Sequence, residues 1–277
     1  MANGSGKTTA INCLLALLKY DKGDITIFGK PMTVDSYDIK QEIGIVMQNV
    51  AVFEQMTVYE NIDYFCGLYV KDKATRQKLV KEAIDFVGLA DYVKIFPKKL
   101  SGGGLLRRLN IACGIAHKPK LIILDEPTVA VDPQSRNNIL EGIQELNRQG
   151  STVIYTSHYM EEVEQICTRI AIIDHGRVIA QGSSEELKGL LKVGETIRID
   201  DIVLEESDLA AIHSLPHVLE LTYHGRTLMI RCTGSQHNLV RILAHLQAQE
   251  LAFGRVLSEL PTLNDVFLEI TGKQLRD

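Results

Sequence analysis

Residues 3–9 are Asn3-Gly4-Ser5-Gly6-Lys7-Thr8-Thr9, a glycine-rich turn followed by apolar residues at helical spacing. Glycines let backbone N–H groups approach phosphate oxygens, and a helix N-terminus adds partial positive charge. Lys7 can reach terminal phosphates, and the Thr8 hydroxyl can ligate Mg²⁺. The stretch therefore predicts a phosphate-binding loop in which all seven residues are candidate nucleotide contacts. Taken alone, the same pattern also occurs in ordinary loops.

A second stretch, Leu121-Ile122-Ile123-Leu124-Asp125-Glu126, is an apolar strand that ends in two carboxylates. Parallel α/β folds place ligands at the carboxyl ends of their strands. Asp125 is thus a candidate Mg²⁺ ligand acting through water, and Glu126 is a candidate base for an attacking water. The alternative is a solvated acidic turn before Pro127. The two stretches lie far apart in the chain, and we therefore favour the interpretation that they belong to separate strands that meet at one phosphate.

Hydrophobic periodicity predicts the elements around these stretches. Strands are expected at 25–28, 43–47, 121–124, 152–156 and 169–174, and helices at 7–18, over much of 58–96 and at 135–147. Strands that are apolar on both faces are typical of a parallel sheet covered by helices. His175-Gly176 is expected to turn the last of these strands into another at 177–180. Ser183 and Glu186 then form a capping box that opens a short helix to Leu191.

Beyond Val193 the pattern changes to a βαββαβ order followed by a last helix. The expected elements lie at 196–204, 207–214, 217–223, 227–232, 236–249, 251–257 and 263–270. This order predicts a small α+β appendage with a ferredoxin-like fold. We therefore expect two domains, an α/β domain at 1–192 and an accessory domain at 193–277.

Composition excludes several classes of protein. The 277 residues are 45% hydrophobic and 23% charged, with a net charge of −5, so no broad basic field favours nucleic acid as a partner. No apolar run approaches the ~20 residues that span a bilayer, so membrane contact is expected only through a partner. Five cysteines without a CxxC pair, and no secretory signal, indicate a reduced cytosolic chain with buried thiols.

Leu100-Ser101-Gly102-Gly103 stands shortly before the strand at 121 and opens a helix. Here the sequence resembles the ABC ATPases over about residues 1–190, with the family's motifs in order. Gln48 matches the Q-loop glutamine, Asp132 in Ala130-Val131-Asp132-Pro133 matches the D-loop, and His158 matches the switch histidine. Individually, Gln48 is equally a surface amide, His158 a satisfied polar residue and Ser101 an N-cap. Their co-occurrence favours the family.

The resemblance implies a P-loop NTPase fold with a helical subdomain at about 55–110. It implies that two chains bind ATP between the phosphate loop of one copy and Ser101, Gly102 and Gly103 of the other, with Asp132 nearby. The catalytic set would be Glu126, His158 and Gln48. Mg²⁺ would be held by Thr8, Gln48 and Asp125.

The expected partners are a transmembrane permease, received by segment 55–98, and a second nucleotide-binding subunit. The chain would then work at the cytoplasmic face of the membrane. The tail at 261–272 and residues 158–162 resemble ATPases of drug-resistance and antibiotic self-resistance exporters. An ATP-hydrolysing exporter subunit is therefore the expected function. A soluble ABC-type ATPase and a degenerate cassette that binds nucleotide as a regulator stay open as alternatives.

Two departures from the family pattern carry expectations of their own. Met1 stands where the phosphate loop's first glycine is expected, so we expect the preceding strand and the adenine-stacking aromatic to be missing. A polypeptide that starts at Met1 is then expected to fold poorly or bind ATP weakly. Gly104-Leu105-Leu106 departs from the usual signature, and Gly104 lowers helix propensity by ~1 kcal/mol relative to alanine.

Overall fold

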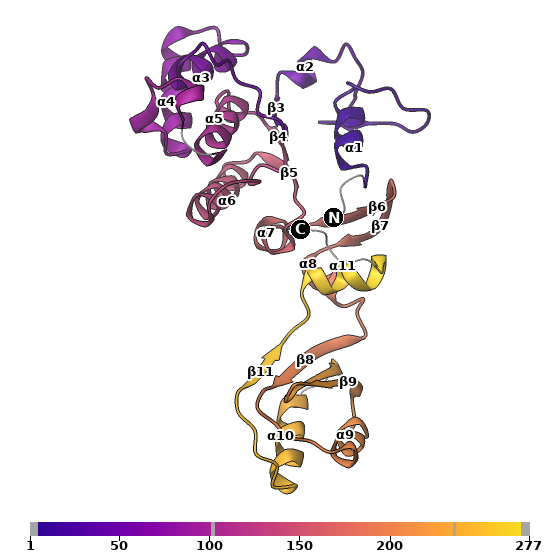
Figure 1. Ribbon diagram of the computed structural model, residues 1–277. Helices are drawn as coiled ribbons and strands as arrows, with labels where there is room; N and C mark the ends of the chain where they lie inside the picture. The colour runs from indigo at the N-terminus through magenta and orange to yellow at the C-terminus, as the bar shows by residue number, and fades with distance from the viewer. Residues whose placement is uncertain (1–4, 101–102, 235–236, 273–277) are drawn as a thin grey trace. The chain divides into compact units, whose positions relative to one another are not determined.

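The computed structural model describes residues 5–100, 103–234 and 237–272 (Figure 1). The chain divides into two compact units, Met1–Cys167 with Ile173–Arg177, and Thr168–Ile172 with Val178–Asp277. The domain division at 192–193 stays a prediction, because the two units exchange segments around 168–177.

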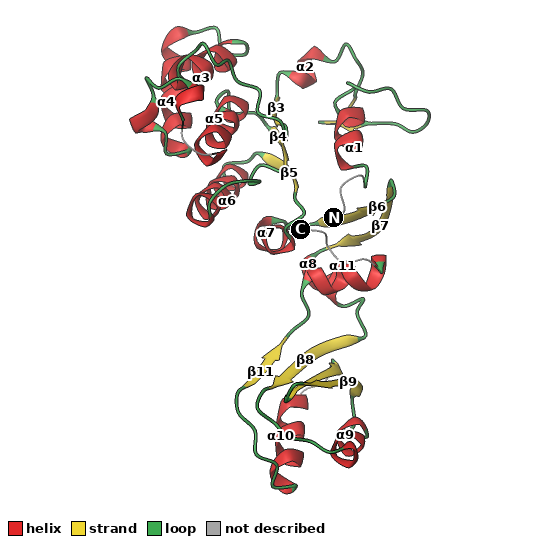
Figure 2. Cartoon of the chain, in the orientation of Figure 1, coloured by secondary structure: helices red, strands yellow, loops and turns green. Residues whose placement is uncertain are grey.

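The first unit alternates helices and strands, as Figure 2 shows. In chain order its elements are α1 (Lys7–Leu14), β1 (Thr26–Ile27), β2 (Lys30–Pro31), α2 (Tyr37–Lys40), β3 (Ile43–Val46), α3 (Val58–Gly67), α4 (Lys73–Phe86), two short 3₁₀ turns (Ala90–Tyr92 and Pro97–Lys99), α5 (Gly103–Ile115), β4 (Leu121–Asp125), α6 (Pro133–Arg148), β5 (Thr152–Thr156) and α7 (Met160–Ile166).

A parallel sheet in the order β3-β4-β5 lies between two layers of helix. Because side chains alternate along a strand, β4 contributes to both layers. Leu121 and Ile123 pack with Ile11 of α1, whereas Ile122 and Leu124 join the larger cluster formed with α3, α4, α5 and α6. The sheet therefore holds the end of β4, which carries the two predicted carboxylates, between α1 and the helical layer.

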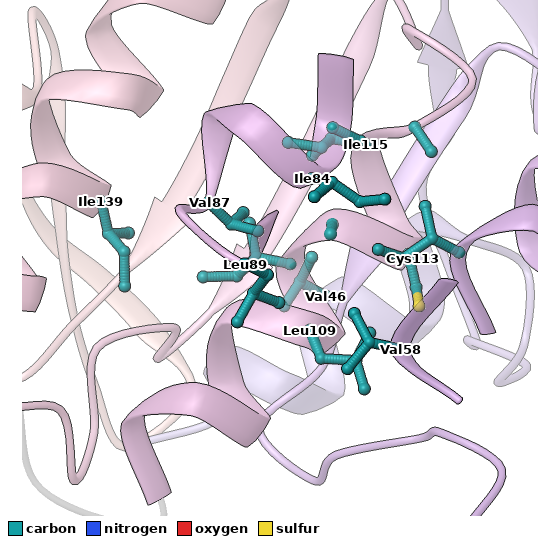
Figure 3. Close-up of a cluster of buried hydrophobic side chains, with 14 of the residues drawn as sticks. Val46, Val58, Ile84, Val87, Leu89, Leu109, Cys113, Ile115 and Ile139 are labelled. Atoms are coloured by element: carbon teal, nitrogen blue, oxygen red, sulfur yellow. The ribbon is translucent and has the colours of Figure 1, made fainter. Parts of the chain in front are cut away.

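The larger cluster is the main core of this unit, and Figure 3 shows part of it. Val46, Leu89 and Leu109 are completely buried there. Helix α5 approaches β3 very closely, because an added Cβ on Gly114 would lie 2.6 Å from Val46 Cγ2 and 2.7 Å from the Ile45 carbonyl oxygen. Glycine at 114 is thus a packing requirement of the helix-on-sheet contact.

Several sequence-predicted boundaries need correction. Helix α1 ends at Leu14, and Leu17 and Leu18 beyond it are 67% and 48% exposed. The helical pattern at 58–96 breaks into α3 and α4, because Asp72 caps a new helix by accepting from the Thr75 N–H.

The strand predicted at 169–174 does not pair with β3, β4 or β5 among the described residues. Instead β6 (Ile170–Asp174) pairs with β7 (Arg177–Gly182). His175 and Gly176 between them have positive φ, which favours a tight hairpin over a crossover. The predicted turn into the following strand is confirmed, whereas the placement of this strand with the parallel strands was wrong for the described residues.

The second unit contains the predicted ferredoxin-like fold. Its elements are α8 (Ser184–Lys188), β8 (Val193–Ile199), α9 (Glu206–His213), β9 (Val218–His224), β10 (Thr227–Thr233), α10 (Asn238–Ala248), β11 (Val256–Glu259) and α11 (Leu263–Thr271). The antiparallel order is β11-β8-β10-β9, and the last strand begins later than the predicted 251. One face of this sheet packs on α9 and α10 through residues such as Ile197, Ile230 and Leu246. Ser183 and Glu186 form the predicted capping box of α8.

Neither unit contains, within the residues described, a helix long and apolar enough to cross a bilayer. All five cysteines are free thiols, and Cys66, Cys113 and Cys232 are buried. Burial raises the pKa of Cys66 and of Cys232 to about 11, so both thiols stay protonated and unreactive near neutral pH.

Candidate functional site

The phosphate loop enters α1 through a left-handed glycine. Gly6 is the N-cap of α1 and has φ of 100°, a conformation that strongly favours glycine. The Ser5 carbonyl accepts a hydrogen bond from the Gly176 N–H at 2.9 Å, which fixes the turn. The Ser5 hydroxyl is buried without a hydrogen-bond partner among the described residues, which suits an anion contact. Asn3 and Gly4 lie outside the described residues.

Asp125 ends β4 and is 1% exposed. Its Oδ2 accepts a hydrogen bond from Thr8 Oγ1 at 2.9 Å, and its Oδ1 accepts one from Thr156 Oγ1. The carboxylate is therefore oriented by α1 on one side and by the end of β5 on the other. The structure thus brings together the two stretches that the sequence placed far apart.

Glu126 is the centre of the site. Its side chain is 7% exposed, and three side chains from separate segments surround its carboxylate. Gln48 Nε2 donates to Oε2 at 3.1 Å, Lys7 Nζ lies 3.8 Å from Oε1, and His158 Nδ1 lies 3.6 Å from Oε1. All three catalytic candidates therefore meet beside the phosphate-loop lysine.

Two side chains of helix α5 hold the backbone around Gln48 by hydrogen bonds. Arg107 Nη1 donates to the Gln48 carbonyl oxygen at 2.6 Å and to that of Met47 at 3.3 Å, while Asn110 accepts from the Ala51 N–H at 3.2 Å. Arg107 is 7% exposed, and desolvation lowers its pKa. Arg107 falls in the helix that the sequence predicts after Gly103, but the sequence does not predict these contacts.

The loop after Gln48 is organised by Asn61, which is fully buried in α3. Its Oδ1 accepts from the Phe53 N–H at 2.7 Å, and its Nδ2 donates to the carbonyl oxygens of Phe53, Met56 and Thr57, each at 3.0 Å. One amide side chain thus satisfies several backbone groups of a loop with no regular structure.

The remaining candidates lie at other places. Ser101 and Gly102 are outside the described residues, and α5 begins at Gly103. Thr9 is exposed on α1. Asp132 is the N-cap of α6 and accepts from the Ser135 N–H at 2.9 Å; hydrogen bonds from Ser135 lower the pKa of Asp132. The nucleotide contacts predicted for these residues stay predictions.

The donor set fits a nucleotide with a hard divalent cation. Mg²⁺ prefers oxygen ligands, and the Thr8 hydroxyl, the Asp125 carboxylate and the Gln48 amide supply them. The lysine, the left-handed glycine and the N-terminus of α1 are suited to phosphate. Glu126, beside an amide and an imidazole, is suited to act on a water molecule.

Comparison with known proteins agrees with this geometry. Residues 2–129 match the ABC transporter family. The chain is 40% identical over 277 residues to the linearmycin resistance ATP-binding protein LnrL of Bacillus subtilis (strain 168), an alignment that covers 99% of this chain and 89% of that protein. The chain belongs to the ABC transporter family. An ABC relative, the daunorubicin/doxorubicin resistance ATP-binding protein DrrA of Streptomyces peucetius, is 34% identical over 279 residues and covers 99% of this chain and 83% of its own length.

A solved ABC structure supports the fold. The dimeric post-hydrolysis state of an ATP-binding cassette bound to ADP and Pi superposes with a TM-score of 0.59 and 26% identity, covering 65% of this chain and 81% of that one. The chain is therefore an ATP-binding subunit with the P-loop NTPase fold, and ATP hydrolysis is the activity of its family. The predicted family, fold class and enzyme class are confirmed.

Proposed function

We propose that this chain hydrolyses ATP with Glu126 as the general base, and that it drives an exporter through a separate membrane permease. The observation that carries the proposal is the meeting of Lys7, Gln48 and His158 around the Glu126 carboxylate. A carboxylate within reach of an amide and an imidazole can hold a water molecule and accept its proton. His158 would stabilise charge that develops on the terminal phosphate.

Mg²⁺ would be held by Thr8, Asp125 and Gln48. When bound it would supply charge neutralisation of the phosphate oxygens. The chain's own residues do the rest of the work. Lys7 and the backbone N–H groups of Ser5 and Gly6 bind phosphate, with Asn3, Gly4 and Thr9 as further contacts, and Thr156 orients Asp125 by donating a hydrogen bond to Oδ1.

A second copy of the chain would complete the nucleotide site. Ser101 and Gly102 come directly before α5 in the sequence, and Gly103 is its first residue; the N-terminus of a helix favours an anion. Asp132 would lie in the same contact between the copies. The dimeric cassette with ADP and Pi supports this arrangement, because it is a homologous fold captured as a dimer.

The permease would contact an aromatic cluster on the helical layer. Phe53 and Phe65 stack, and Tyr64 packs edge-to-face against both, with ring centroids 5.0–5.8 Å apart. Phe53 and Tyr64 are 40% and 43% exposed. Exposed aromatic clusters are typical of protein interfaces. This contact would place the chain at the cytoplasmic face of the membrane. The exported molecule would be an antibiotic-like compound, since two relatives are named for resistance to such compounds.

Substitution of Glu126 by glutamine tests the proposal. Glu126→Gln keeps the shape of the side chain and removes the base, so kcat for ATP hydrolysis should fall by about 10²-fold or more while ATP binding persists. Size-exclusion chromatography with ATP should then show a stable dimer. The matched control is Glu141→Gln on α6, an exposed glutamate whose loss should change neither quantity. Unchanged turnover in Glu126→Gln would refute the proposal.

A further inference from the structure

A second glutamate, which the proposed chemistry does not use, is buried nearby. Glu162 in α7 has a side chain only 4% exposed, whereas Glu161 beside it is exposed. A buried carboxylate is costly unless hydrogen bonds and charges compensate it. The environment of Glu162 therefore has to supply several donors.

Three hydroxyl groups donate to this carboxylate. Ser157 Oγ lies 2.7 Å from Oε2, Tyr155 Oη lies 2.8 Å from Oε2, and Thr128 Oγ1 lies 2.9 Å from both oxygens. The donors come from β5, from the loop after β5 and from the loop after β4. Burial raises the pKa of Tyr155 well above its usual range, so the phenol keeps the proton that it donates. One carboxylate thus joins three segments of the site.

Two contacts of Glu162 lead toward His158, one through the Ser157 hydroxyl and one through Arg136. Ser157 Oγ, which donates to Glu162, also accepts from the Tyr159 N–H at 3.0 Å, and so fixes the backbone on both sides of His158. Arg136 Nε lies 3.4 Å from Glu162 Oε1, an ion pair that is not a hydrogen bond. The Arg136 guanidinium lies 4.8 Å from the centroid of the Tyr159 ring, which in turn lies 4.1 Å from the centroid of the His158 ring.

The Thr128 hydroxyl links Glu162 to the catalytic base. Thr128 is completely buried and follows Glu126 by two residues, so its hydrogen bond to Glu162 restrains the segment that carries the base. Glu126 itself has φ of 51° and donates its N–H to the Thr156 carbonyl oxygen at 3.1 Å. The 3.6 Å separation of His158 Nδ1 from Glu126 Oε1 therefore joins two segments that Glu162 holds together.

We infer that Glu162 is a positioning residue that holds His158 against Glu126 through the hydroxyl groups of Ser157 and Thr128. The inference rests on the proposed function, in which both partners act at the terminal phosphate. Lys7 and Thr8 do not belong to this network, so phosphate binding should not depend on Glu162. A residue that acts on geometry in this way changes kcat and leaves KM for ATP unchanged.

The test compares Glu162→Gln with Glu161→Gln in the full chain. Glutamine has the same shape as glutamate but only one acceptor oxygen, whereas the three hydroxyl donors now share two carboxylate oxygens. Glutamine also lacks the negative charge that pairs with Arg136. We expect kcat to fall by about 10- to 100-fold, as for a small misplacement of a catalytic group, with KM for ATP within about twofold of wild type. Glu161→Gln should match wild type in both.

A spectroscopic readout separates positioning from general loss of structure. In protein labelled with ¹³C-histidine, the ring signal of His158, assigned from a His158→Gln variant, carries a ring-current shift from Tyr159. Glu162→Gln should move this signal and Glu161→Gln should not. If Glu162→Gln does not fold, Ser157→Ala breaks the link to His158 alone and should move the same signal.

The outcomes distinguish a failure of the positioning role of Glu162 from a failure of the proposed ATPase function. An unmoved His158 signal overturns the positioning role, whether or not kcat falls, and so does a loss of activity that comes mainly from a raised KM. If the wild type and Glu126→Gln hydrolyse ATP equally, the proposed function fails, and the His158 signal still reports whether Glu162 positions the histidine.

Discussion

Replacing Gly114 by alanine sets two opposing effects against each other. Alanine in a helix interior is favoured over glycine by ~1 kcal/mol. At 114, however, the new Cβ would lie 2.6 Å from Val46 Cγ2 and 2.7 Å from the Ile45 carbonyl oxygen, where carbon atoms prefer 3.5–4.0 Å. The helix must then move away from β3 by roughly 1 Å. Overpacking typically costs about 1–3 kcal/mol, and with two contacts this short, one of them with a backbone atom, we expect about 2–3 kcal/mol.

The net effect should therefore be a loss of about 1–2 kcal/mol of unfolding free energy in Gly114→Ala. For a unit of this size that corresponds to a melting temperature about 2–8 °C lower. Because the chain contains no tryptophan, far-UV circular dichroism during urea and thermal unfolding is the suitable measurement.

A control exists in the same helix. A Cβ on Gly104 would meet only Asp132 Oδ2 at 3.6 Å and Val131 Cγ1 at 3.9 Å, which are ordinary contacts. Gly104→Ala should therefore be neutral or stabilising by up to about 1 kcal/mol. If Gly114→Ala proves as stable as wild type, or more so, helix propensity dominates and the close helix-on-sheet contact does not constrain this position.

Two further predictions concern buried polar groups. Asn61→Ala should lower the unfolding free energy by about 2 kcal/mol, because the Phe53 N–H loses its acceptor and the carbonyl oxygens of Phe53, Met56 and Thr57 each lose a donor. The carbonyl oxygens of Phe53 and Thr57 keep a backbone donor, which limits the loss, and equal urea midpoints would contradict the prediction. Burial lowers the pKa of His117 to about 4, below its ordinary 6.5, so the unfolded chain binds the proton more readily. The free energy of unfolding is therefore unaffected by protonation of His117 above pH 6.5. It falls by up to about 3 kcal/mol as the pH drops toward 4, because the unfolded chain takes up the proton first. His117→Phe, which keeps a ring stacked on Tyr69, should remove that part of the pH dependence, and parallel curves for the two proteins from pH 7 to 4 would rule it out.

The sequence predicted the elements whose signal is local. The strand at 152–156 has its predicted bounds, and β4 carries the carboxylates at its end as expected. The capping box of α8 needs only two residues three positions apart, so it was visible in the sequence. Motif order predicted the meeting of Lys7, Gln48, Glu126 and His158, because the family resemblance supplies long-range information that periodicity lacks.

Features that depend on distant contacts were not predictable in this way. Where α1 ends depends on which of its leucines pack into the core, and Leu17 and Leu18 stay exposed. The turn from the strand at 169–174 into the next strand was predicted, but its apolar run was also placed with the parallel strands, because such a run is compatible with both kinds of pairing. The network of Glu162 combines hydroxyl groups from three segments, and serine, threonine and tyrosine carry no distinctive spacing.

The left-handed backbone at Glu126 affects the choice of an inactive variant for trapping experiments. A non-glycine residue at φ of 51° is held in a sparsely populated conformation at a cost of order 1 kcal/mol or more. Glycine or asparagine would relieve that cost while removing the base, and so would change loop dynamics and chemistry together. Glutamine keeps the strained backbone conformation, so the effect of Glu126→Gln reports on proton transfer alone.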